Sequence, residues 1–184
     1  MTQTQEIRTC TSQTFKVGKS KTVTYVTRGT LILLAAVFIP TWYVAVNDPV
    51  TEGIVILTAT TAIVAACMIY FYLISPKSVE LTAEAIILHR VMGHKTFGYA
   101  EIHDAGLWNG SPSELLRLCG SGAYCGYIGW FSGGCLGRHF EYVGNYSNCF
   151  YIRLNGGRTY LISCDAPDIV VKKGNNILVD LVNL

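Results

Sequence analysis

Three cysteines and a histidine in the middle of the chain form the pattern C-x5-C-x9-C-x3-H, which comprises Cys119, Cys125, Cys135 and His139. Zinc is bound by a tetrahedron of nitrogen and sulfur ligands, so this set has a suitable composition for a structural zinc ion. The spacing lacks the closely spaced cysteine pair that zinc knuckles contain. Scattered reduced thiols are therefore the favoured interpretation, and we expect no metal.

The same region contains Gly120-Ser121-Gly122 and Gly126, and glycine-rich loops can cradle phosphate with their backbone N–H groups. A phosphate cradle opens a helix, and its motif ends in Gly-Lys-Ser or Gly-Lys-Thr. Neither feature follows here, so a packing role is favoured over nucleotide binding. The histidines of the chain also include no His-Glu-x-x-His pair. The sequence therefore predicts a protein that is not an enzyme and has no cofactor.

Residues 119–137 contain seven glycines in nineteen positions, together with several aromatic residues. So many glycines are incompatible with a regular strand or helix throughout, so we expect an ordered loop inserted in the fold. Aromatic side chains contribute strongly to protein interfaces. The alternative is that the rings fill the mouth of the β domain or its membrane-facing side. The candidate interaction surface comprises Tyr124, Tyr127, Trp130 and Phe131.

Three basic or titratable residues, Arg90, His94 and Lys95, flank a predicted turn. Each basic side chain near an anionic membrane surface contributes about 1 kcal/mol to attraction. These residues are the candidate contacts to lipid headgroups. Residues 75–184 carry equal numbers of basic and acidic side chains, so a strongly basic face is not expected.

Two stretches without charge, residues 30–46 and 53–74, predict membrane-spanning helices. The second has 22 residues, or about 33 Å as a helix, which crosses a hydrocarbon core. The linking residues 47–52 contain Asp48 and Glu52 but no lysine or arginine, whereas basic residues precede the first stretch and follow the second. The positive-inside rule then places both termini in the cytoplasm.

The composition excludes several classes of protein. The chain has 184 residues, of which 51% are hydrophobic and 14% charged, and its formal net charge is only +2. These values argue against a disordered chain, a coiled coil and a polybasic nucleic-acid binder. Seven cysteines, an odd number without a regular framework, favour reduced thiols in the cytosol.

The region after residue 75 reads as a mainly-β domain. Short alternating runs at residues 78–81, 85–90 and 95–99 predict a meander, and further runs at 138–143, 149–154 and 159–163 predict later strands. Asn155-Gly156 is a strong hairpin signal. Residues from 165 onward predict a C-terminal helix, although Gly174 interrupts its pattern. No βαβ alternation is present, which disfavours a nucleotide-binding α/β fold.

This layout resembles the bacterial pleckstrin-homology-like (PH-like) domains that are tethered by an N-terminal two-helix membrane hairpin. The matching segments are SVELTAEAIILHR at residues 78–90, YAEI at 99–102, GSGAYCGYIGWF at 120–131 and CFYIRLNGGRTYLISCDAPD at 149–168. The resemblance implies a bent β-barrel of about seven strands with a C-terminal helix, located at the inner membrane of a bacterium. The activity of such families is mostly unassigned.

We therefore expect a basic N-terminal tail (1–28), a transmembrane hairpin (29–74) and a cytoplasmic PH-like domain (75–184) with the insert 119–137. The expected function is a non-catalytic protein-interaction or assembly module, whose partner is another protein or a second copy of the chain. The alternatives are binding of anionic lipid headgroups and an enzyme with an unrecognised site. No nucleic-acid partner is expected.

Overall fold

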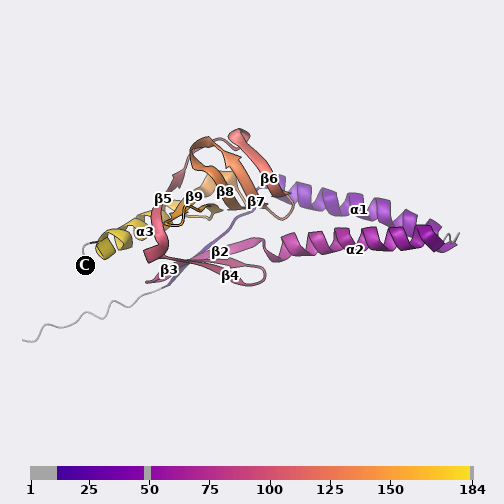
Figure 1. Ribbon diagram of the computed structural model, residues 1–184, viewed down its shortest axis with the longest axis horizontal. Helices are drawn as coiled ribbons and strands as arrows, with labels where there is room; N and C mark the ends of the chain where they lie inside the picture. The colour runs from indigo at the N-terminus through magenta and orange to yellow at the C-terminus, as the bar shows by residue number, and fades with distance from the viewer. Residues whose placement is uncertain (1–11, 48–50, 183–184) are drawn as a thin grey trace, which may run out of the picture.

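The computed structural model describes residues 12–47 and 51–182 of the chain. Two long helices, α1 (Lys21–Asn47) and α2 (Thr51–Leu73), lie side by side and project from one end of a β-rich region (Figure 1). Both helices are long and apolar enough to cross a membrane, and none of their most apolar stretch is buried inside the protein. The two predicted apolar helices are thus confirmed, and they are not core helices of this fold.

Helix α1 begins well before its apolar stretch. The Ser20 hydroxyl accepts a hydrogen bond from the Val23 backbone N–H at 3.2 Å, which is the contact of an N-terminal cap. The Val23 side chain is fully buried against the β region. The first turn of α1 is therefore part of the β-rich fold, and only the later turns are bare.

The β-rich region has two sheets in the described residues, with strand orders β1-β2-β3-β4 and β5-β9-β10-β8-β7-β6. All neighbouring strands are antiparallel except β8 and β10, which pair in parallel. The strands and the last helix are β1 (Gln13–Lys16), β2 (Pro76–Leu81), β3 (Ala85–Arg90), β4 (His94–Gly98), β5 (Ile102–Trp108), β6 (Leu115–Gly122), β7 (Tyr127–Gly133), β8 (Gly137–Val143), β9 (Cys149–Leu154), β10 (Thr159–Ser163) and α3 (Pro167–Val182).

The expected bent barrel of about seven strands is wrong. The described residues form ten strands, and the two sheets do not close into a barrel. The strands that were not expected are β1, β6 and β7, and the six-stranded sheet ends at the edges β5 and β6. The mainly-β region and the C-terminal helix were predicted correctly.

Strand β1 was not predicted, because residues 1–28 were expected to form a tail. It pairs with β2 from Gln13 opposite Leu81 to Lys16 opposite Ser78. The chain then crosses to the second sheet, where the Ser20 N–H donates to the Gly144 carbonyl at 2.9 Å. The segment before α1 thus ties the two sheets together.

The glycine-rich segment 119–137 is mostly a β-hairpin, so the expectation of an inserted loop is wrong. Gly120 of β6 lies opposite Gly129 of β7. Both have positive φ, and a Cβ atom at either would collide with the backbone of the facing strand. The glycines are compatible with a strand here because they allow two backbones to approach unusually closely.

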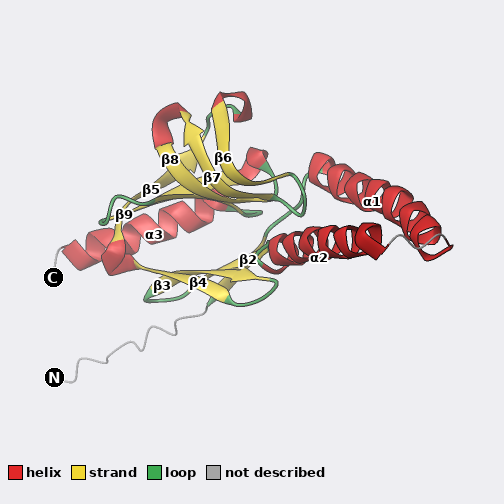
Figure 2. Cartoon of the chain, turned by 45° about the vertical axis from the view of Figure 1, so that its right-hand side comes forward, coloured by secondary structure: helices red, strands yellow, loops and turns green. Residues whose placement is uncertain are grey.

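The main core lies between the two sheets and under α3. Phe97 from the first sheet, Phe150 from the second and Val170 from α3 are fully buried in it. Helix α3 packs against β5 and β9 (Figure 2). Gly174 does not break the helix. It is buried, and a Cβ at this position would point toward Ile86 and Tyr99.

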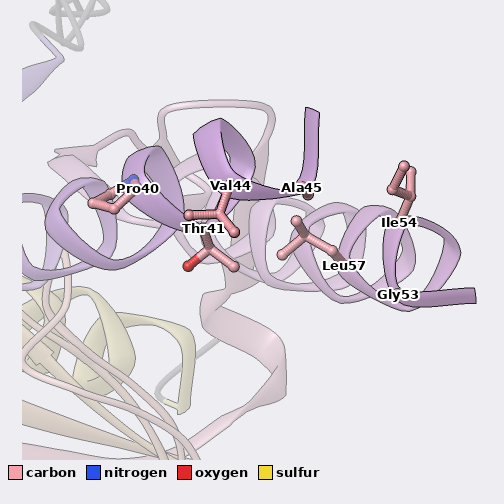
Figure 3. Close-up of a pocket in the computed structure, with 7 residues that line it drawn as sticks. All are labelled: Pro40, Thr41, Val44, Ala45, Gly53, Ile54 and Leu57. Atoms are coloured by element: carbon pink, nitrogen blue, oxygen red, sulfur yellow. The ribbon is translucent and has the colours of Figure 1, made fainter. Parts of the chain in front are cut away.

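An apolar groove of about 480 Å³ lies between the two helices near their connection (Figure 3). Pro40 lies within α1 at this level and has no N–H to donate to the preceding turn. Beside the groove, Trp42 Nε1 of α1 donates a hydrogen bond to Thr61 Oγ1 of α2 at 3.4 Å. The groove is lined by Pro40, Thr41, Val44, Ala45, Gly53, Ile54 and Leu57, none of which is charged.

Candidate anion-binding site at the base of the helices

The turn between β3 and β4 is fixed to the end of α2. The Met92 N–H donates to the Leu73 carbonyl at 2.8 Å, and the Val91 N–H donates to the Ser75 carbonyl at 3.0 Å. Gly93 adopts a φ of +76°, which lets the chain reverse here. The turn therefore lies beside the base of the helices (Figure 2).

Two buried polar atoms without a partner lie at this junction. The Ser75 side chain is only 1% exposed, and its Oγ has no hydrogen-bond partner among the described residues. The same holds for Nε of Arg90, which lies opposite Pro76 where β2 pairs with β3. These are the only buried side-chain nitrogen or oxygen atoms left unpaired in the described part of the chain. Each such group costs about 1–3 kcal/mol unless a ligand or water satisfies it.

A second cation lies close by on the neighbouring strand. Lys95 precedes the buried Phe97 on the core-facing side of β4, just as Arg90 follows Leu88 on that side of β3. Lys95 Nζ donates to the Tyr160 hydroxyl at 3.0 Å and lies 4.4 Å from the centre of that ring. Both cations thus lie on the face of the first sheet that is directed toward the second sheet.

The second sheet contributes two tyrosines to the same place. Burial raises the pKa of Tyr142, and the nearby Arg90 guanidinium partly opposes this effect. Tyr142 also lies near Tyr160 and near Tyr70 of α2. Since its hydroxyl stays protonated at neutral pH, Tyr142 is available as a hydrogen-bond donor. We call Ser75, Arg90, Lys95, Tyr142 and Tyr160 the junction site.

The third predicted headgroup contact, His94, is separated from the other two. Its side chain is exposed and lies opposite His89, on the face of the sheet away from the core. There His89 Nε2 is 2.7 Å from a carboxylate oxygen of Glu80. The hydrogen bond with His89 holds the pKa of Glu80 below its usual value. His94 thus shares the turn with the junction site but not its inner surface.

The junction site combines two cations with hydroxyl donors and contains no carboxylate. Among the side chains that the structure describes, the ion pairs are His89–Glu80 and His139–Glu141, and neither Arg90 nor Lys95 pairs with an acidic residue there. Such a set of donors is suited to an anion, and guanidinium groups pair especially well with phosphate. Sequence reasoning found Arg90 and Lys95. It missed Ser75, Tyr142 and Tyr160, because only the pairing of distant segments brings them together.

The four aromatic residues of the predicted interaction surface do not form one patch. Tyr127 and Phe131 lie on the face of the six-stranded sheet that points away from the other sheet, which we call the outer face. Trp130 lies on the opposite side, where its ring packs edge-on against Phe140 at 5.3 Å. Tyr124 belongs to the β6–β7 turn and is partly buried. The alternation of side chains along β7 explains the division.

The residues considered for zinc and phosphate binding are also placed separately. No three His, Cys, Asp or Glu side chains of the described residues are grouped as metal ligands. Cys119 and Cys135 are exposed, Cys125 is buried, and His139 contacts Glu141 instead. The glycine run forms part of the β6–β7 hairpin and is followed directly by a strand, not by a helix, so the arrangement of a phosphate cradle is absent from this part of the structure.

Comparison with known proteins gives no relative. No protein-family model matches the chain, and no curated protein or solved structure matches it either. Membership of the PH-like family therefore stays a prediction.

Proposed function

We propose that this protein is a non-catalytic, membrane-anchored module that binds anionic lipid headgroups at the junction site. The observation that carries the proposal is the pair of buried, unpaired atoms, Ser75 Oγ and Arg90 Nε, directly at the base of α2. A headgroup phosphate placed there would supply acceptors to both atoms and a counter-charge to Lys95. The bare helices support the proposal, because a bilayer around them brings headgroups to this level.

In this proposal α1 and α2 span the inner membrane of a bacterium as a hairpin, with both termini and the β region in the cytoplasm. Exposed Lys19, Lys21 and Arg28 lie around the base of α1, and Lys77 follows α2. The basic side chains thus gather at the β-region end of the hairpin, as the positive-inside rule requires of a cytoplasmic face. A cysteine at Asn47 in a cysteine-free background should react with an impermeant maleimide outside intact spheroplasts. Labelling of a cysteine at Ser12 instead would invert the topology and contradict the proposal.

Lipid binding is tested with the full chain in nanodiscs of phosphatidylcholine, with and without phosphatidylglycerol. We expect phosphatidylglycerol to raise the unfolding temperature of the wild type, because a ligand that binds only the folded state stabilises it. Arg90→Gln should lose this increase. Arg138→Gln is the matched control, since Arg138 is an exposed cation that lies over Trp130, four residues before Tyr142 in β8. An equal increase in wild type and Arg90→Gln, or no increase in the wild type, would refute the proposal.

Ser75→Ala gives a second, sign-dependent test. Without an anionic lipid the substitution removes an unpaired buried hydroxyl, so it should leave stability unchanged or raise it. With phosphatidylglycerol the wild type should gain more stability than the alanine variant does. An equal gain in the wild type and in Ser75→Ala would show that this hydroxyl does not contact the lipid.

A protein-interaction or assembly role is the second candidate, and an exposed apolar edge supports it. Strand β6 is an edge of its sheet, and it carries Leu116 and Leu118, which are 67% and 50% exposed. An edge strand with exposed leucines can add a strand from a partner or a second copy. Chemical crosslinking of the full chain in native membranes, with and without Leu116→Lys, distinguishes this role: loss of a crosslinked product in the variant supports it.

A further inference from the structure

A second concave site lies on the outer face of the six-stranded sheet, on the other side of the sheet from the core. It has a volume of about 450 Å³, which is in the range of small-molecule sites. Its lining comes from β6, β7 and the short turns that precede β6 and follow β8. We call it the outer pocket; it is lined by Pro112, Ser113, Leu115, Arg117, Gly122, Tyr127, Phe131 and Tyr146.

The walls of the outer pocket are aromatic, and ring packing and buried hydrogen bonds fix their positions. The rings of Tyr127 and Tyr146 are 4.6 Å apart, and Trp108 packs against Tyr146 at 5.7 Å. The Tyr146 hydroxyl donates to Glu141 Oε2 at 2.6 Å, and Glu141 Oε1 lies 2.9 Å from His139 Nε2. Burial and the neighbouring Glu141 raise the pKa of Tyr146, so its hydroxyl remains a donor.

Arg117 is the one charged side chain in the lining of the outer pocket. It forms no ion pair within the described residues. Glu141 is fully buried and its two oxygens are already engaged by His139 and Tyr146, so it does not neutralise Arg117. Glu114 reaches in a different direction, toward Gly134. The pocket therefore presents an unneutralised guanidinium beside rigid aromatic walls.

Gly122 gives Arg117 the room that this position requires. A Cβ atom on Gly122 would overlap the Arg117 guanidinium, whereas the backbone of Gly122 is not in the left-handed region. Alanine at this position should therefore displace the guanidinium without straining the strand. The glycine offers a way to move the charge without removing it.

We propose that the outer pocket binds a carboxylate that is attached to an aromatic body, with Arg117 pairing the carboxylate and the rings of Tyr127, Phe131 and Tyr146 enclosing the body. Guanidinium and carboxylate form two parallel hydrogen bonds, and aromatic walls add packing that a bare inorganic anion would not use. The ligand is a free aromatic acid or the C-terminal residue of a protein, which present the same chemistry.

The test uses the full chain in uncharged detergent micelles and ¹⁹F NMR of 3-(4-fluorophenyl)propionate, with its amide as the neutral counterpart. We expect the acid to bind the wild type. The amide should bind at least about tenfold more weakly than the acid. Arg117→Gln should reduce binding of the acid to the level of the amide, and Gly122→Ala should weaken it. Arg138→Gln, an arginine on the other side of the same sheet, should bind the acid as the wild type does.

Several results would overturn the proposal: no binding of the acid by the wild type, equal binding of acid and amide, or unchanged binding by Arg117→Gln. Circular dichroism of each variant checks that a loss of binding is not a loss of fold. A peptide with a free C-terminal phenylalanine distinguishes the two sources. Tighter binding of the peptide than of the small acid indicates a protein C-terminus, and exclusion of the peptide indicates a free acid. The junction site has no part in this experiment, so the lipid proposal stands or falls separately.

Discussion

Replacing Glu141 with leucine should destabilise the six-stranded sheet, whereas replacing it with glutamine should not. The side chains of His139 and Glu141 are fully buried. Since His139 Nδ1 must donate to the Gly137 carbonyl, at 2.8 Å, its Nε2 shares one proton with Glu141 Oε1. A glutamine amide can donate to Nε2 of the neutral ring and accept from Tyr146. Leucine leaves Nε2 buried without a partner.

The expected loss of stability in Glu141→Leu follows mainly from the unpaired Nε2 of His139. An unsatisfied buried polar group costs about 1–3 kcal/mol, and each kcal/mol lowers the unfolding temperature of a chain of this size by about 2–4 °C. The Tyr146 hydroxyl also loses its acceptor, which adds to this cost. For Glu141→Gln we expect a change of about 1 kcal/mol or less.

Near-ultraviolet circular dichroism of the detergent-solubilised chain measures the effect, because it reports on the packed rings around Tyr146. The double variant His139→Leu with Glu141→Leu removes both partners, so it should be more stable than Glu141→Leu alone. If Glu141→Leu and Glu141→Gln unfolded at the same temperature, the claim that this hydrogen bond stabilises the sheet would be wrong.

Three further predictions concern other parts of the fold. Gly129→Ala should open the β6–β7 hairpin, because φ at Gly129 is +143° and an added Cβ would lie 2.2 Å from the Cys119 carbonyl oxygen. Thermal unfolding should show a loss of stability of at least about 1–3 kcal/mol. Gly156→Ala should leave stability unchanged, because a Cβ at Gly156 would have open space around it. Burial raises the pKa of Cys164 to about 11, so its thiol should react with a thiol reagent only as the pH approaches 11. At neutral pH the reagent should modify the exposed Cys119 but not Cys164. Equal rates of modification of the two thiols at neutral pH would contradict this. A soluble fragment that starts at β2 should give a β-rich circular dichroism spectrum. It should unfold at a lower temperature than the same fragment joined to residues 12–20, because it lacks β1 and the crossing to the second sheet. Identical unfolding temperatures would show that β1 does not contribute.

Local patterns were enough to predict much of the β region. The strands at residues 85–90, 149–154 and 159–163 were found because alternating or continuous apolar residues and the Asn155-Gly156 turn mark them in the sequence. The two apolar helices were equally clear. In contrast, β1 is a four-residue strand, Gln13–Lys16, that is largely exposed. It has no apolar pattern of its own, and only its pairing with β2 defines it.

The candidate sites show the same limit more strongly. Arg90 and Lys95 were recognisable because they are cations that flank a turn. The unpaired Ser75 could not be recognised, since an isolated serine after a helix has no special signal until β3 covers it. Arg117 was missed because it lies next to exposed Leu116 and Leu118 in a stretch with no alternation, where β6 contains a bulge. Its position in the outer pocket depends on register, which local sequence does not encode.

The joints between the helices and the β region are short and hydrogen-bonded. α2 ends at Leu73 and β2 begins at Pro76, while on the α1 side Thr27 Oγ1 accepts a hydrogen bond from the Cys125 N–H at 2.9 Å. In a bilayer, helices respond to a change of hydrophobic thickness by changing their tilt. Because both helices are fixed to the sheets, such a change of tilt would rotate the whole β region relative to the membrane plane. The height of the outer pocket above the membrane would then change with bilayer thickness.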